Sequence, residues 1–181
     1  MKPGGETGAF GEEITKKYGR ENIIYYDHGD KNKNKNVFAC KGFYGTSVGN
    51  VNRLADIDLF IADSDGNVKV LIEIEERESS PKKIIGDIFS IAMCNQVGVA
   101  INKKNSTNFQ ITKETYLIIG GVIPTQGNRK DKIENIIKER IKIFKHDDED
   151  CLDLNKVELY FDGKIESALA RIRLKLNDLL L

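Results

Sequence analysis

The stretch ADIDLFIADSDGNVKVLIEIEE, residues 55–76, constrains the fold of this 181-residue chain more than any other segment. Two runs of alternating apolar residues flank Asp65-Gly66, and this pattern predicts a β-hairpin because glycine supplies the positive φ of a tight turn. A turn centred between Asp65 and Gly66 fixes the register of the two strands. The expected cross-strand pairs are Phe60 with Leu71, Asp58 with Glu73, and Asp56 with Glu75.

This register gives the hairpin two different faces. The acidic face becomes apolar close to the turn, at Phe60, Ala62 and Leu71, which indicates a sheet that is covered on both sides. The opposite face is apolar throughout and must pack against another part of the protein. Its members are Ile57, Leu59, Ile61, Val70, Ile72 and Ile74.

Four carboxylates crowd one patch of the predicted hairpin. Directly opposed residues have Cβ atoms about 4.5–5.5 Å apart, and like charges there destabilise a sheet by up to about 1 kcal/mol. Burial adds a desolvation cost, so we expect the patch to bind a cation or to hold protons. Oxygen ligands favour Mg²⁺, which takes one or two carboxylates and keeps waters or substrate phosphates in its other positions. The alternative is an ordinary hairpin whose acids form its solvated face.

Composition restricts the classes of function. The 40% hydrophobic content suits one domain with a substantial core. The 28 basic and 28 acidic residues give a net charge of zero, so a polyanion must be met by a local basic surface. No run approaches the ~20 apolar residues of a membrane span, and the start MKPGGETGAFGEE has no apolar signal core. These features predict a cytoplasmic protein without membrane contact.

Cysteine and histidine do not show the spacing of a metal site. Cys40, Cys94 and Cys151 are far apart and lack CxxC spacing, which predicts reduced structural thiols rather than disulfides or zinc ligands. His28 and His146 are isolated in polar stretches, which disfavours zinc and a nucleophilic triad. The chain also has no Walker loop and no dinucleotide-binding glycine pattern.

The rest of the chain predicts alternating helices and strands. Ser80-Pro81 supplies an N-cap and a first-turn proline for a helix that ends near Asn95 and follows the acidic end of the hairpin. Residues 28–36 are too polar to pack and predict a loop. This order favours an α/β domain with a mixed β-sheet flanked by helices. The other expected elements are helices at 6–18, 129–145 and 165–180, strands at 23–26, 97–101, 116–119 and 157–161, and an irregular segment at 42–50.

The motif and the order of elements resemble the PD-(D/E)XK nuclease superfamily. The resemblance rests on Ala55-Asp56-Ile57-Asp58 and Glu73-Ile74-Glu75, and it covers about residues 6–120. The core of that superfamily is a helix, a three-stranded meander, a helix and a further strand. An Asp on its second strand and an acid-x-Lys pair on its third strand bind Mg²⁺ and activate water. Glu75 replaces the usual lysine, and this E-x-E form is similar to type II restriction endonucleases of the BamHI type.

The resemblance implies roles for the hairpin acids. Asp58 and Glu73 would be metal-binding catalytic residues. Glu75 would bind the metal or position the attacking water. Asp56 is the alternative strand acid, because it is expected on the same face as Asp58. Ala55 stands where the superfamily usually has proline, a position at which proline is often absent.

Residues outside the hairpin are implied as well. The superfamily often adds a glutamate from the first helix; Glu12 and Glu13 are both available, and Glu13 is preferred because it lies nearer the apolar stripe of that helix. Lys82 and Lys83 could replace the missing lysine or contact a phosphate, and they could equally be ordinary surface lysines. Arg53 is expected to contact the substrate backbone beside them.

The activity implied is that of a Mg²⁺-dependent DNA endonuclease of the restriction type, with Mn²⁺ as a substitute metal. A homodimer is expected because two equivalent sites are needed to cut both strands of a symmetric sequence. One nuclease-like domain over 1–181 is expected, with its core at about 6–120 and a helix-strand-helix extension at about 121–181. The alternatives are a repair or recombination nuclease acting on branched or damaged DNA, and a catalytically decayed module that binds nucleic acid or protein.

Overall fold

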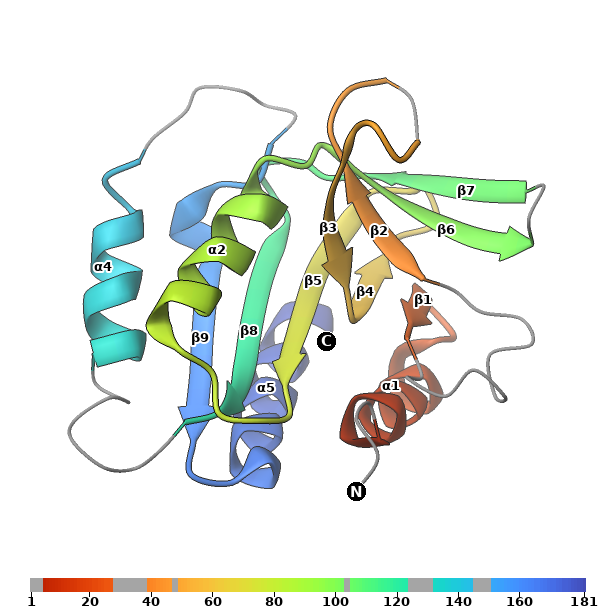
Figure 1. Cartoon of the computed structure of the whole chain (residues 1–181). Coiled ribbons are helices and arrows are strands. Elements are labelled where there is room, and N and C mark those ends of the chain that lie inside the picture. The colour runs from red at the N-terminus through yellow and green to blue at the C-terminus, as the bar shows by residue number, and fades with distance from the viewer. Residues whose placement is uncertain (1–4, 28–38, 47–48, 103–104, 124–131, 145–150) are drawn as a thin grey trace.

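A computed structural model of the chain describes residues 5–27, 39–46, 49–102, 105–123, 132–144 and 151–181. The predicted loop at 28–36, together with His28 and His146, lies outside the described residues. Two β-sheets and the helices that pack on them make up the described part (Figure 1). The predicted α/β class with a mixed sheet flanked by helices is confirmed.

The larger sheet has five strands in the order β1-β4-β5-β8-β9. The pairs β1–β4 and β4–β5 are antiparallel, whereas β5–β8 and β8–β9 are parallel, so the sheet is mixed. The strands predicted at 23–26, 116–119 and 157–161 are all present. The five strands are β1 (Ile23–Tyr26), β4 (Leu59–Ala62), β5 (Val68–Glu75), β8 (Tyr116–Val122) and β9 (Val157–Asp162).

A second, antiparallel sheet has the order β3-β2-β6-β7. The strand predicted at 97–101 is present, but the prediction of an irregular segment at 42–50 is wrong at its start, since a strand runs to Phe43, and the strand at 105–110 was not expected. Both missed strands lack a long apolar alternation, so their pairing depends on neighbours that are distant in sequence. The four strands are β2 (Cys40–Phe43), β3 (Arg53–Ile57), β6 (Gln96–Asn102) and β7 (Asn105–Gln110).

Helices cover both faces of the larger sheet, as the apolar pattern of the hairpin predicts (Figure 1). On one face lie α1 (Gly5–Tyr18) and α5 (Ile165–Leu180), and their apolar residues pack against Leu59, Ile61 and Ile72. On the other face α2 (Pro81–Ala92) and residues of the second sheet pack against Phe60 and Leu71. The hairpin strands are therefore part of the core on both sides.

The helix that follows the hairpin begins where the sequence predicts. The Ser80 hydroxyl caps α2 by accepting a 3.3 Å hydrogen bond from the backbone N–H of Lys83, and Pro81 occupies the first turn. Its side chains Ile84 and Ile88 are fully buried. This capping places Lys83 in the first turn of α2, eight residues after Glu75 at the end of β5.

The C-terminal part differs in detail from the single helix predicted at 129–145. In its described portion a π-helical segment, η1 (Lys132–Ile137), precedes the short helix α4 (Lys138–Ile141). Glu134 holds η1 in place by accepting a 2.7 Å hydrogen bond from the Phe161 N–H and by pairing with Arg171 at 2.6 Å. The 3₁₀ turn η2 (Leu154–Lys156) leads into β9.

Candidate functional site

The hairpin register is confirmed near the turn. Phe60 pairs with Leu71, and Gly66 has a φ of +87° in the turn, as the Asp-Gly signal predicts. The turn is longer than two residues, because the Asp63 N–H donates a 3.0 Å bond to the carbonyl oxygen of Asn67. A register shift at the end of β4 accommodates the longer turn.

The register is wrong at the acidic end, because the chain changes sheets at Asp58. The residues before Asp58 form β3 and pair with β2, and the residues after it form β4 and pair with β5. Asp56 consequently faces Lys41 of β2 and does not face Glu75. Ile57 is redirected too, and it packs in the cluster that contains α2 instead of the one that contains α1.

The bend brings Asp58 and Glu73 together. Oδ2 of Asp58 accepts a 2.8 Å hydrogen bond from the backbone N–H of Ile74, and the Asp58 N–H donates a 3.2 Å bond to Oε1 of Glu73. The Asp58 carboxylate thus accepts the hydrogen bond that a main-chain carbonyl would accept if β3 ran beside β5. The expected proximity of these two acids is present, produced by the bend rather than by a regular cross-strand pair.

Both acids titrate at higher pH than ordinary carboxyls. Burial raises the pKa of Asp58 to about 6; the Ile74 hydrogen bond opposes this shift, and the negative charge of Glu75 adds to it. Burial also raises the pKa of Glu73 well above its ordinary value, and the charges of Asp58 and Asp87 raise it further. An ionised pair in this position is costly, and a bound cation would stabilise it.

Glu75 is held by two partners. Lys83 on α2 forms an ion pair with Oε1, and the hydroxyl of Ser79 donates a 2.8 Å hydrogen bond to Oε2. Burial lowers the pKa of Lys83, but the hydrogen bond to Glu75 and the charges of Glu75 and Asp87 outweigh burial, so its pKa is raised. Both predicted lysines are exposed, and Lys83 is the one that contacts an acid of the hairpin.

Asp87 also belongs to this group, and sequence reasoning missed it. Its Oδ2 lies 3.9 Å from Lys83 Nζ, is buried, and has no hydrogen-bond partner among the described residues. Burial raises the pKa of Asp87, with Lys83 opposing and Glu75 adding to the shift. An available signal was that Asp87 is the lone acid of the apolar helix PKKIIGDIFSIA, four residues after a candidate lysine. We call Asp58, Glu73, Glu75 and Asp87, with Lys83, the acid cluster.

A glycine on the neighbouring strand permits the close approach of β8 to Glu75. Gly121 pairs with Glu75 in the parallel ladder, and a Cβ atom at Gly121 would lie 2.5 Å from Glu75 Cβ and 2.6 Å from its carbonyl oxygen. No larger residue fits there without displacing the acid.

The predicted glutamate of the first helix lies elsewhere. Glu13 forms a two-pronged ion pair with Arg173 of α5, with both N–O distances at 2.7 Å, and this hydrogen bonding lowers its pKa. It therefore joins α1 to α5 on the face opposite the acid cluster, and its neighbour Glu12 is exposed. The start of α1 reaches the hairpin instead through Thr7, whose N–H and hydroxyl donate to Oε1 of Glu76 at 2.8 and 2.9 Å.

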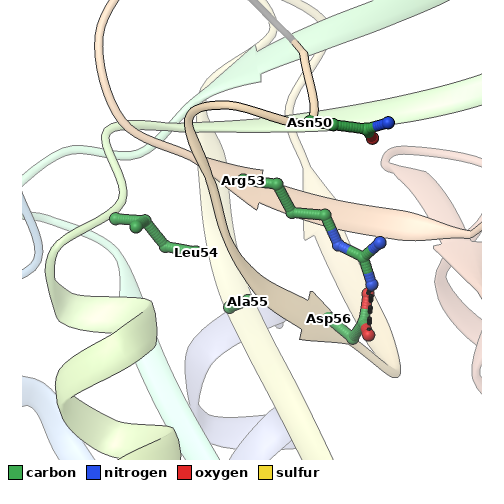
Figure 2. A pocket seen from close by; sticks show the side chains of 5 residues that line it. All are labelled: Asn50, Arg53, Leu54, Ala55 and Asp56. Carbon is green, nitrogen blue, oxygen red and sulfur yellow. Dashed lines mark hydrogen bonds and ion pairs between the residues drawn. The ribbon is translucent and has the colours of Figure 1, made fainter.

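A surface pocket of about 320 Å³ lies beside β3 (Figure 2). Arg53, predicted as a substrate contact, extends along it and meets the carboxylate of Asp56. Asp56, the alternative metal ligand of the prediction, is thus separated from the acid cluster and paired with Arg53 and Lys41. The pocket is lined by Asn50, Arg53, Leu54, Ala55 and Asp56.

Other features of the described residues restrict the site further. No three His, Cys, Asp or Glu side chains within them are arranged as ligands of one metal ion. Asp58 and Glu73 nevertheless suit Mg²⁺, which needs only one or two carboxylates when phosphate and water complete its shell.

Cys40, Cys94 and Cys151 are buried and free of disulfides. In the described part of the chain, no helix has the length and apolarity to cross a bilayer.

Comparison of the chain with protein-family models, with curated proteins and with solved structures gives no match.

Proposed function

We propose that this chain is a Mg²⁺-dependent DNA endonuclease of the PD-(D/E)XK type that hydrolyses phosphodiester bonds. The observation that carries the proposal is the contact between Asp58 and Glu73 at the bend, where burial raises the pKa of both carboxyls, the charge of Glu75 adds to the shift of Asp58, and the charge of Asp58 adds to that of Glu73. Two buried carboxyls with raised pKa values offer hard oxygen ligands, and they fit a divalent cation better than a purely structural role. Asp58 and Glu73 would hold the metal.

The order of elements supports the same proposal. The helix α1, the antiparallel strands β1, β4 and β5, the helix α2 and the strand β8 follow one another along the chain, and β8 is parallel to β5. This order resembles the helix, meander, helix and strand expected for the superfamily core, and the resemblance supports the proposal. The second sheet is assembled from the segments between β1 and β4 and between α2 and β8.

The lysine that the motif lacks would be supplied by α2. A bound Mg²⁺ supplies a water of lowered pKa and neutralises charge on the phosphorane. Glu75 would orient this water, since Ser79 and Lys83 fix both of its oxygens. The Lys83 ammonium would act beside it, in place of the lysine two residues after Glu73, and would stabilise negative charge that develops on the phosphate.

The experiment is incubation of supercoiled plasmid with the purified chain and Mg²⁺, with EDTA as the metal-free arm. Nicked or linear DNA is expected with Mg²⁺ alone, and Asp58→Asn and Glu73→Gln should abolish it. Asp65→Asn is the matched control, because it removes the same charge from the exposed turn at the other end of the hairpin. Cleavage by Asp58→Asn at the wild-type rate would refute the assignment.

The products separate the classes of enzyme. Discrete fragments from long duplex DNA would support a restriction-type homodimer, and selective cutting of branched or damaged DNA would support a repair nuclease. A chain that binds DNA and cuts neither substrate would be the decayed binding module, an alternative favoured by the lack of three metal ligands within the described residues.

A further inference from the structure

Asp56 forms ion pairs with two cationic side chains at the surface of the second sheet. Lys41 of β2 and Arg53 of β3 both pair with its carboxylate. The Asp56 side chain is 65% exposed, compared with 25% for Lys41 and 38% for Arg53. Ion pairs this exposed contribute little to folding, so stability does not account for two cations converging on one carboxylate.

The net charge of this group is positive. Partial burial raises the pKa of Asp56, but the hydrogen bonds and charges of Lys41 and Arg53 outweigh it, so the pKa lies below its ordinary value. The carboxyl is therefore ionised at neutral pH, and two positive charges share one negative charge. An anion that replaced Asp56 could engage both cations.

The group lies close to the acid cluster along the chain. Asp56 precedes Asp58 by two residues across the end of β3, so their Cα atoms are at most about 7 Å apart. Successive phosphates of one DNA strand rise about 3.4 Å along the duplex axis and are also rotated around it, so this distance is comparable to the spacing of neighbouring phosphates. A strand whose phosphate lies at the acid cluster can therefore place a neighbouring phosphate near Arg53.

The pocket beside β3 provides space for such a group. Its volume of about 320 Å³ equals that of roughly ten water molecules. Asn50 and Arg53 line it with hydrogen-bond donors, and Leu54 and Ala55 add apolar surface (Figure 2). The planar fork of arginine matches the oxygens of a phosphate, and lysine binds it as a point charge.

We propose that Lys41 and Arg53 form a subsite for a backbone phosphate of the DNA substrate. Asp56 forms ion pairs with both side chains until the phosphate displaces its carboxylate. This subsite rests on the proposed function. Asp56 then acts as an internal competitor for DNA. It is neither a metal ligand nor a support of the fold.

The test is DNA binding without cleavage, measured as fluorescence anisotropy of a labelled duplex in EDTA over a series of salt concentrations. Asp56→Asn is expected to tighten binding roughly threefold to tenfold at low salt and to steepen the slope of log affinity against log salt by about one. Arg53→Gln and Lys41→Gln are expected to weaken binding and to make that slope shallower. In the Lys41→Gln/Arg53→Gln background, Asp56→Asn should give no such gain.

The control is Glu13→Gln, which makes the same change in net charge and frees Arg173 on the opposite face. Equal tightening by Glu13→Gln and Asp56→Asn would overturn the subsite, because the effect would then be one of overall charge. Wild-type protein that cleaves plasmid while Asp56→Asn binds no more tightly would overturn the subsite and leave the proposed function standing. Wild-type protein that neither binds duplex nor cuts plasmid would overturn both.

Discussion

The backbone N–H of Asp58 donates a 3.2 Å hydrogen bond to Oε1 of Glu73, so two acids with raised pKa values are in direct contact where the chain changes sheets. This hydrogen bond favours ionised Glu73, but burial and the charge of Asp58 outweigh it, so ionisation of both carboxyls is costly and a cation bound between them would offset that cost. Stability, its pH dependence and its response to divalent ions therefore all report on this pair.

Asp58→Asn should stabilise the metal-free protein at neutral pH. The pKa of Asp58 is raised from 3.8 to about 6, so the stability due to its proton is present below pH 3.8 and is lost as the pH rises through about 6. At about 1.4 kcal/mol per pKa unit, the loss amounts to about 3 kcal/mol above that range. Asparagine removes this titration and keeps an oxygen that can accept the Ile74 hydrogen bond.

Urea unfolding in EDTA at pH 5 and at pH 8 measures this effect. The wild type should lose more stability between the two values than Asp58→Asn. Asp65→Asn, in the exposed turn, should behave as the wild type does. Equal pH dependence of the wild type and Asp58→Asn would show that this carboxyl does not titrate abnormally.

Lys83→Met should reduce cleavage about 100-fold, the scale found when one electrostatic contact to a transition state is removed. It should also lower stability by about 1 kcal/mol, because Glu75 loses its cation while Asp87 remains close. Lys82→Met is the matched control: it makes the same change one residue away, at an exposed position, and should leave cleavage and stability close to those of the wild type. Similar plasmid-nicking rates for the two variants would exclude a special role for Lys83.

Exchanging the charges of Glu75 and Lys83 tests their pairing. Glu75→Lys alone places two ammonium groups together and should lower the melting temperature, whereas Glu75→Lys/Lys83→Glu should restore most of it. Glu75→Lys already creates the acid-x-Lys pattern usual in the superfamily, so the restored ion pair is what should return part of the lost cleavage to the double variant. A double variant that melts no higher than Glu75→Lys would contradict the pairing.

Local signals predicted the elements that surround the site. The alternation of residues 55–76, the Asp-Gly turn and the Ser80-Pro81 cap each act within a few residues, and the hairpin, its turn and α2 are present accordingly. The apolar patterns on both faces of the hairpin also predicted a sheet covered on both sides. These features depend on backbone geometry and on burial, which a sequence displays directly.

The errors have a common physical origin in long-range pairing. The residue pattern of 55–61 fits a single uninterrupted hairpin strand. No residue in this segment indicates that its first part, before Asp58, pairs with β2 instead. Because β2 pairs with β3, Asp56 forms an ion pair with Lys41 and does not lie in the acid cluster. Because α1 lies beside α5, Glu13 forms an ion pair with Arg173 and does not reach the acid cluster. Asp87 was missed because the apolar stripe of α2 predicts only which residues face the core, and the approach of Asp87 to Lys83 and Glu75 depends on where α2 packs.

The proposed binding of a divalent cation by the acid cluster is tested most directly as a shift in melting temperature, without any need for the DNA target. A ligand at about 100 times its dissociation constant adds roughly 2.7 kcal/mol, and about 2–4 °C per kcal/mol is expected for a domain of this size. Mg²⁺, Mn²⁺ and Ca²⁺ at millimolar concentration should therefore raise the wild-type midpoint by several degrees, and Asp58→Asn should lose most of that shift. An unchanged wild-type midpoint with all three ions, or an equal shift in Asp58→Asn, would contradict a metal site at Asp58 and Glu73.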